Sequence, residues 1–219
     1  MKTLIAIPCM DTTPVEFTKS LIFLEKGPNV NVCFHQGSLI YDARNCISIT
    51  AINDGFDYVL WLDSDIVFPI NTLKTLRKHM EDNPDIHMVS GVYFKRNDTG
   101  LPVIYDEVEP PTFDNGVPVR HLHEYKDFPR NDFFQIRGCG FGCVMTSVHL
   151  LRDVWDKQGN AFTPLPWAGE DISFCHKVNQ LGYKIYCDSS ISCGHIGQYM
   201  YGEGYVKNLP EGSKTGGDD

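Results

Sequence analysis

The stretch DYVLWLDSDIV at residues 57–67 decides the fold that this sequence predicts. Residues 58–62 form a continuous apolar run that is too short for a helix, so we expect a buried parallel strand. The strand ends in Asp63, Ser64 and Asp65. Because open α/β sheets bind their ligands at the carboxyl ends of strands, these two carboxylates predict a ligand site there, and they suit a hard divalent cation.

The segments around this strand alternate between strand and helix patterns. Apolar runs predict strands, and apolar positions at helical spacing between capping and breaking residues predict helices. This order predicts an α/β fold with right-handed crossovers and a mostly parallel central sheet flanked by helices. The expected strands are residues 3–8, 30–34, 58–62, 88–94, 133–137 and 183–187 with another from Ile191, and the expected helices are residues 14–26, 42–52, 69–82, 147–158 and 171–181.

Composition limits the classes of function. The chain has 219 residues, of which 42% are hydrophobic, enough for one large domain or two small ones. Its 28 acidic and 19 basic residues give a formal charge of -9, which argues against broad electrostatic binding to nucleic acid or to an anionic membrane. We find no leader-like segment and no apolar run of membrane-spanning length, so we expect a cytoplasmic protein whose eight cysteines are reduced and mostly buried.

Two segments depart from the alternating pattern. Residues 95–130 contain repeated prolines and turn-forming pairs, which predict long loops and hairpins, a form that often carries function. Residues 202–219 have little to bury, so we expect a flexible C-terminal tail. Between them, Gly138, Gly140 and Gly142 follow a predicted strand, where glycine lets the backbone approach a ligand closely.

Further chemistry-bearing residues lie toward the end of the chain. Glu170 and Asp171 open a predicted helix, where acids also have the simple role of complementing the helix dipole. His195 stands between two glycines, and a lone histidine is more often a structural hydrogen-bonding group than a ligand. His121 and His123 alternate on a predicted strand, but we identify no third ligand and reject a metal site there.

Three elements in this order resemble the metal-dependent glycosyltransferases of the GT-A fold and are similar to family 2. They are the Asp63-Ser64-Asp65 strand end, Gly169-Glu170-Asp171 at a helix start, and Gly194-His195 after the last strands. The Asp-x-Asp element alone is a weak signal, and the combination is a strong one. The resemblance covers approximately residues 1–201 as one domain, with residues 95–130 as an acceptor-side insertion.

The resemblance implies roles for these residues. It implies transfer of a sugar from a nucleotide-diphosphate donor to an acceptor hydroxyl with inversion, and Asp171 as the general base, with Glu170 as the alternate. It implies Mn²⁺ or Mg²⁺ as the cofactor, with Mn²⁺ favoured by a nitrogen ligand. The implied metal ligands are Asp63, Asp65 and His195, and the implied donor-binding residues are Pro8, Asp11, Asp42, Arg44, Asn45, Asp63, Ser64, Gly138 and Gly140.

One departure from the family's pattern concerns the first strand end, where Asp11 stands in place of the asparagine of Pro-x-x-Asn and leaves the nucleobase contacts open. Two other classes remain: a sugar-phosphate nucleotidyltransferase, and a catalytically silent carbohydrate-binding relative. The former is expected to carry a basic, glycine-rich loop after the first strand, which residues 8–14 lack. The donor sugar, the oligomeric state and the acceptor stay open; a glycan, a protein, a small molecule or a modified DNA base would each fit a bacterial or phage enzyme.

Overall fold

Strand β3 (Tyr58–Leu62) forms where the sequence predicts it, and all of its residues are buried. The computed structural model describes residues 1–37, 39–97, 99–197 and 200–203. β3 lies inside a seven-stranded sheet. The order of this sheet is β2 (Val30–Gln36), β1 (Thr3–Cys9), β3, β10 (Cys143–Ser147), β5 (Met88–Val92), β11 (Ile185–Ser192) and β8 (Phe133–Ile136).

The sheet is mostly parallel, as expected. β1 pairs in parallel with β2 and β3, and β5 pairs in parallel with β11. β10 and β8 run the other way. β10 was not predicted as a strand; it lies between β3 and β5 and is antiparallel to both.

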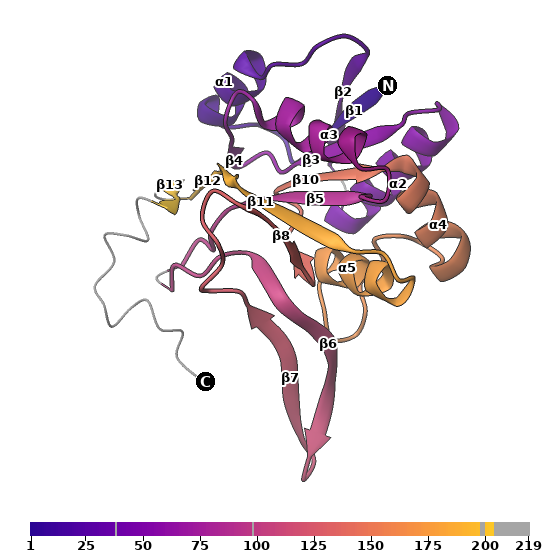
Figure 1. Cartoon of the computed structure of the whole chain (residues 1–219), viewed down its shortest axis with the longest axis vertical. Coiled ribbons are helices and arrows are strands. Elements are labelled where there is room, and N and C mark those ends of the chain that lie inside the picture. Colours follow the sequence, from indigo (N-terminus) through magenta and orange to yellow (C-terminus); the bar gives the residue numbers. More distant parts are fainter. Residues whose placement is uncertain (38, 98, 198–199, 204–219) are drawn as a thin grey trace.

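Helices cover both faces of the sheet (Figure 1). Side chains alternate along each strand, so β1 sends Leu4 and Ala6 into one hydrophobic cluster and Ile5 and Ile7 into the other. The first cluster packs against α2 (Ile40–Asn53), α4 (Val148–Gln158) and α5 (Glu170–Gln180), and the second against α1 (Val15–Phe23) and α3 (Thr72–Asp82). The sheet is therefore the middle layer of three.

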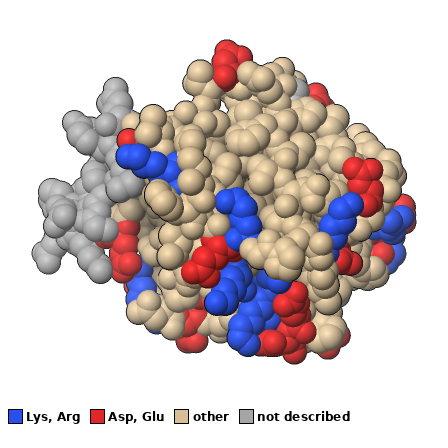
Figure 2. Space-filling view, turned by 90° about the horizontal axis from the view of Figure 1, so that it is seen from above, with Lys and Arg blue, Asp and Glu red and all other residues tan. Residues whose placement is uncertain are grey.

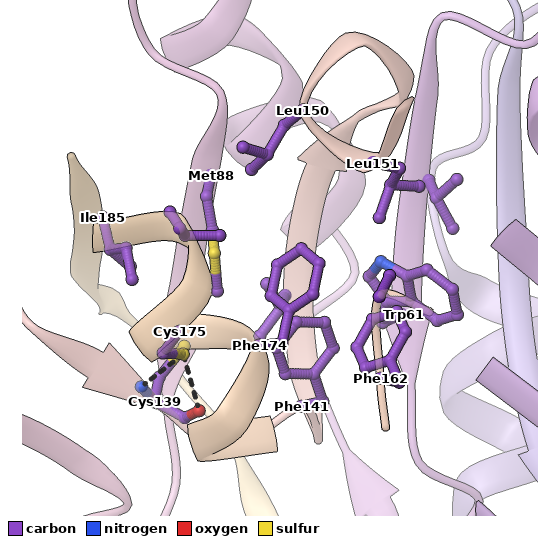
Figure 3. Close-up of a cluster of buried hydrophobic side chains, with 14 of the residues drawn as sticks. Trp61, Met88, Cys139, Phe141, Leu150, Leu151, Phe162, Phe174, Cys175 and Ile185 are labelled. Carbon is purple, nitrogen blue, oxygen red and sulfur yellow. Dashed lines mark hydrogen bonds between the residues drawn. The ribbon is translucent and has the colours of Figure 1, made fainter. Parts of the chain in front are cut away.

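The first cluster is rich in aromatic rings (Figure 3). The Phe162 ring stacks on Phe174 at 4.6 Å between centroids, and the Phe141 ring meets both edge to face. Trp61 of β3 contacts the same group and donates a hydrogen bond to the Thr146 hydroxyl. The buried rings join β3 and α5 to the loop before α5, so the elements that carry the acidic residues have a rigid base.

The expected insertion contains a long hairpin. Strands β6 (Ile104–Asp114) and β7 (Val117–Glu124) pair antiparallel, and β6 also pairs with the short β9 (Gly138–Cys139). The hairpin extends away from α1 and α3 (Figure 1). At its base, Tyr105 and Val108 pack against Ile172 of α5. The hairpin is thereby fixed next to the N-terminus of α5.

Several element boundaries differ from the expectation. α2 begins at Ile40 rather than Asp42, α3 begins at Thr72 rather than Pro69, and α1 ends at Phe23. β11 is one continuous strand where two were expected. A second small sheet, β13 (Met200–Tyr201), β12 (Gly194–Ile196) and β4 (Ile66–Val67), was also unexpected. From residue 204 onward the expected flexible tail lies outside the described residues.

The surface charges are mixed (Figure 2) and the cysteines are unpaired, as the composition led us to expect. On the face seen from above, Lys and Arg lie beside Asp and Glu rather than in one continuous basic patch (Figure 2). On α3, for example, Arg77 pairs with Glu81 and Lys78 with Asp82. The eight cysteines are free thiols, five of them buried. Among the described residues, the chain has no helix with the length and apolar character needed to cross a membrane.

Candidate functional site

A pocket of about 250 Å³ opens at the carboxyl ends of β1 and β3. The pocket has a polar side formed by the end of β3 and an apolar side formed by the end of β1 and the start of α2. The predicted residues Pro8, Asp63, Ser64 and Asp65 lie together here, as the parallel order of β1 and β3 requires. The remaining lining residues are Cys9, Met10, Ile40 and Ala43.

Arg44 is the buried centre of the charge network next to this pocket. Its side chain is 2% exposed, and it donates one hydrogen bond to Asp63 Oδ1 at 2.7 Å and another to Glu170. Its guanidinium also lies 5.3 Å from the centre of the Phe141 ring. Burial acts to lower the pKa of Arg44, but the charges of Asp63 and Glu170 outweigh it and raise the pKa. Arg44 therefore stays a fixed cation that ties α2 to β3 and α5.

Asp65 lies between two cationic or potentially cationic groups. Its Oδ2 accepts a hydrogen bond from Arg96 Nη1 at 2.7 Å and is 3.6 Å from His195 Nε2. Burial alone would raise the pKa of Asp65, but His195 and Arg96 together hold it below its usual value. The Nδ1 atom of His195 is 2.8 Å from the Phe94 carbonyl oxygen, so Nδ1 donates a hydrogen bond to that oxygen and Nε2 is turned toward Asp65.

The acids at the start of α5 have different environments although they are neighbours in sequence. Glu170 pairs with Arg44, whereas Asp171 accepts a hydrogen bond from the backbone N–H of Ile172 at 2.7 Å. Burial, and then the charge of Glu170, raise the pKa of Asp171 to about 6, against the opposing effect of Arg44. The Asp171 carboxylate can therefore exchange a proton near neutral pH.

Asn45 lies next to Arg44 but faces the protein interior. It is 7% exposed, and its Oδ1 accepts a hydrogen bond from the backbone N–H of Phe162. Lys177 holds the same loop from the other side by donating to the carbonyl oxygens of Asn160, Ala161 and Thr163. The structure therefore shows Asn45 anchoring the loop that leads into Glu170 and Asp171.

Asp11, Asp42, Gly138 and Gly140 were also predicted to bind the donor, and they are not among the residues that line the pocket. Asp11 and Asp42 are exposed, the latter in the first turn of α2. A Cβ atom on Gly140 would lie 2.1 Å from the Tyr93 hydroxyl, and one on Gly138 would lie 2.7 Å from Val108 Cγ2. Packing inside the protein explains why glycine occupies both positions.

Two of the three side chains expected as metal ligands face each other, and the third is paired with an arginine. Within the described part of the chain, His, Cys, Asp and Glu form no group of three or more that is placed to hold a metal ion. Asp65 Oδ2 and His195 Nε2 nevertheless face each other, and Asp63 is engaged by Arg44. Two protein donors with phosphate oxygens and water completing the shell are a usual arrangement for Mn²⁺ or Mg²⁺.

Sequence reasoning did not find several residues that shape the site. Arg96, Lys177 and Tyr93 each act through a partner that is distant in sequence: Asp65, the loop at residues 160–163, and the Gly142 backbone N–H. A local pattern carries no signal for such contacts, and Arg96 in particular lies in a segment expected to be loop.

Comparison with solved structures supports the fold that these elements form. A197 from STIV matches with a TM-score of 0.64 and 18% identity, over 90% of this chain and 86% of that one. GalNAc-T7, solved with UDP, GalNAc and Mn²⁺, matches with a TM-score of 0.58 and 11% identity, over 95% of this chain and 45% of that one. The structure has the GT-A fold expected from the sequence.

The family follows from the sequence comparison. The model of glycosyl transferase family 2 matches residues 14–155, which is well over half of the chain, and the chain belongs to this family. The matched segment includes Arg44, Asp63 and Asp65 and ends before Asp171 and His195. No curated protein sequence matches the chain. The protein is therefore a glycosyltransferase, as the three sequence elements predicted.

Proposed function

We propose that the protein is a metal-dependent, inverting glycosyltransferase that moves a sugar from a nucleoside-diphosphate donor to an acceptor hydroxyl. The observation that carries this proposal is the arrangement at one edge of the sheet. The pocket holds Asp63 and Asp65 on one side, and the carboxylate of Asp171, with its pKa raised to about 6, lies in the same electrostatic network. GalNAc-T7 was solved with UDP and Mn²⁺, which supports this class of donor.

Asp65 and His195 are the residues that would hold the divalent ion. The bound ion would neutralise charge that develops on the leaving diphosphate. Their partners support this assignment, because the Phe94 carbonyl oxygen fixes the His195 ring with Nε2 toward Asp65. Arg44 and Asp63 have a different role, since their ion pair fixes the end of β3 and holds the Asp63 side chain at the pocket wall.

Asp171 is the proposed general base. An acceptor hydroxyl must lose a proton as its oxygen attacks the anomeric carbon, and a carboxylate with a pKa near 6 accepts that proton at neutral pH. Glu170 suits this role less well, because its carboxylate is already paired with Arg44. A single displacement by the acceptor, on the face opposite to the diphosphate, inverts the anomeric centre without a covalent sugar intermediate.

The acceptor side of the site is proposed to lie toward the β6–β7 hairpin. Tyr105 and Val108 at the hairpin base pack on Ile172, the residue that follows the proposed base. An acceptor that reaches Asp171 therefore passes this base, where Trp167 also packs. Whether the transferred sugar is a hexose or a pentose depends on the donor, and a panel of nucleotide sugars identifies that donor.

The test is donor cleavage by the purified protein. We expect release of nucleoside diphosphate from one member of a panel of nucleotide sugars in the presence of Mn²⁺, first with water as a slow acceptor. Asp171→Asn is expected to lower turnover by roughly a hundredfold or more, the usual contribution of a general base. Glu16→Gln, which removes an exposed acid from the first turn of α1, is the matched control and is expected to keep full activity.

The same assay separates the other two classes. Release of pyrophosphate from a sugar phosphate and a nucleoside triphosphate, with no cleavage of any nucleotide sugar, would identify a nucleotidyltransferase instead. Sugar binding with no cleavage in wild-type protein, and no effect of Asp171→Asn, would identify a catalytically silent relative.

A further inference from the structure

Arg96 occupies a special position next to the proposed metal ligands. It lies on the connection between β5 and β6 and is about half exposed, with 49% of its side chain accessible. Its Nη1 donates to Asp65 Oδ2 at 2.7 Å and to the Ile196 carbonyl oxygen at 3.4 Å. The guanidinium thus binds the carboxylate oxygen of Asp65 that lies 3.6 Å from His195 Nε2.

This contact conflicts with a divalent ion at the same place. An ion held jointly by Asp65 and His195 would approach Oδ2, the oxygen that faces His195 Nε2 and that accepts the Arg96 hydrogen bond. A guanidinium a few ångströms from a doubly charged ion is also repelled by it. Arg44 differs, because its side chain is 2% exposed and it binds Asp63 rather than Asp65. The Arg96 side chain is about half exposed, so it can swing away from Asp65 into solvent.

We propose that Arg96 is an internal cation that holds Asp65 while the site is without metal, and that it must release Asp65 when a divalent ion binds. This inference rests on the metal dependence in the proposed function. Arg96 therefore weakens binding of the free metal ion, and the diphosphate of the donor, which adds ligands to the ion, supplies the interaction that displaces it.

The residues next to Arg96 hold this segment at the base of the β6–β7 hairpin. Lys95, the preceding residue, pairs with Glu124 at the end of β7, and its backbone N–H donates to the Leu101 carbonyl oxygen. Val103 just before β6 donates to the Tyr93 carbonyl oxygen. The turn that carries Arg96 is thereby joined to the base of the hairpin by backbone hydrogen bonds and one ion pair.

The experiment measures binding of Mn²⁺ alone, without nucleotide, by the loss of the free-ion electron paramagnetic resonance signal. Arg96→Gln is expected to bind Mn²⁺ about fivefold more tightly than the wild type, which corresponds to the upper end for a partly exposed ion pair. Arg77→Gln removes an ion-paired arginine from α3 and controls for the change in net charge. Arg96→Ala is a second variant with the same expectation, and Asp65→Asn in the Arg96→Gln background is expected to abolish the gain.

The outcomes distinguish this inference from the proposed function. Equal or weaker Mn²⁺ binding by both Arg96 variants, with Mn²⁺ binding by the wild type intact, overturns the role of Arg96 and leaves the metal-dependent enzyme standing. An equal gain in Arg77→Gln also overturns it, because net charge then explains the effect. Absence of Mn²⁺ binding in every variant, with and without UDP, overturns both.

Discussion

Asp171→Asn is expected to stabilise the folded protein at neutral pH while it removes activity. In the folded protein, burial and the charge of Glu170 raise the pKa of Asp171 from 3.8 to about 6. An acid with a raised pKa favours folding below its unfolded pKa and loses that contribution as pH rises through the folded pKa. This rise in the pKa of Asp171 corresponds to an upper limit of about 3 kcal/mol at pH 8.

Urea unfolding as a function of pH measures this effect. The free energy of unfolding of Asp171→Asn is expected to exceed that of the wild type by about 2–3 kcal/mol at pH 8, and the difference is expected to shrink toward zero as pH falls from about 6 to about 4. Asparagine can still accept the hydrogen bond from the Ile172 N–H, so this local contact is preserved. Turnover of the wild type is expected to rise with pH through a midpoint near 6.

The opposite result would refute this reasoning. If Asp171 only complements the dipole of α5, its removal should destabilise the protein by about 0.3–1 kcal/mol at pH 8. Glu16→Gln is the matched control, since Glu16 is an exposed acid in the first turn of α1. A loss of stability in Asp171→Asn similar to that in Glu16→Gln would mean that the ionised carboxylate of Asp171 does not destabilise the folded protein.

Two further substitutions test the surroundings of the site. Arg44→Met should lower the free energy of unfolding by about 3 kcal/mol in urea titrations at pH 7, because it leaves Asp63 and Glu170 without their buried partner. Adding Glu170→Gln should restore part of this loss. Full stability of Arg44→Met would contradict the role of Arg44 as the buried cation that holds both acids. Gly140→Ala should lower the free energy of unfolding by about 1–3 kcal/mol through overpacking against the Tyr93 hydroxyl, with partial recovery in the Tyr93→Phe background. If Gly140 instead leaves room for a ligand, Gly140→Ala should keep its thermal stability and bind the donor more weakly.

The fold was predictable from the sequence where local patterns are strong. The run at residues 58–62 and the alternation around it predicted the mostly parallel sheet with helices on both faces. β10 was missed because its five residues follow a glycine-rich turn and lead directly into α4, with Ser147 capping that helix by accepting from the Leu150 N–H. An antiparallel strand in the middle of the sheet is a long-range feature, and nothing within five residues signals it.

The candidate site was predictable in its residue types and less so in its contacts. The family resemblance grouped Asp63, Asp65 and His195, and in the structure Asp63 and Asp65 line one pocket while His195 lies next to Asp65. The family resemblance favoured Asp171 over Glu170 as the general base, but the physical difference between the two acids depends on Arg44 reaching Glu170 from another helix. Roles that depend on contacts between distant segments require the tertiary structure.

Nucleotide binding at the Asp63–Asp65 edge tests the metal-dependent donor site most directly. Isothermal titration with nucleoside diphosphates, with and without Mn²⁺, should find one base that binds only with the metal, and Asp65→Ala should abolish that binding. Asp82→Ala, which removes an exposed acid paired with Lys78 on α3, should leave it unchanged. Binding that is equally tight without metal, or that survives Asp65→Ala, would contradict a metal-dependent donor site.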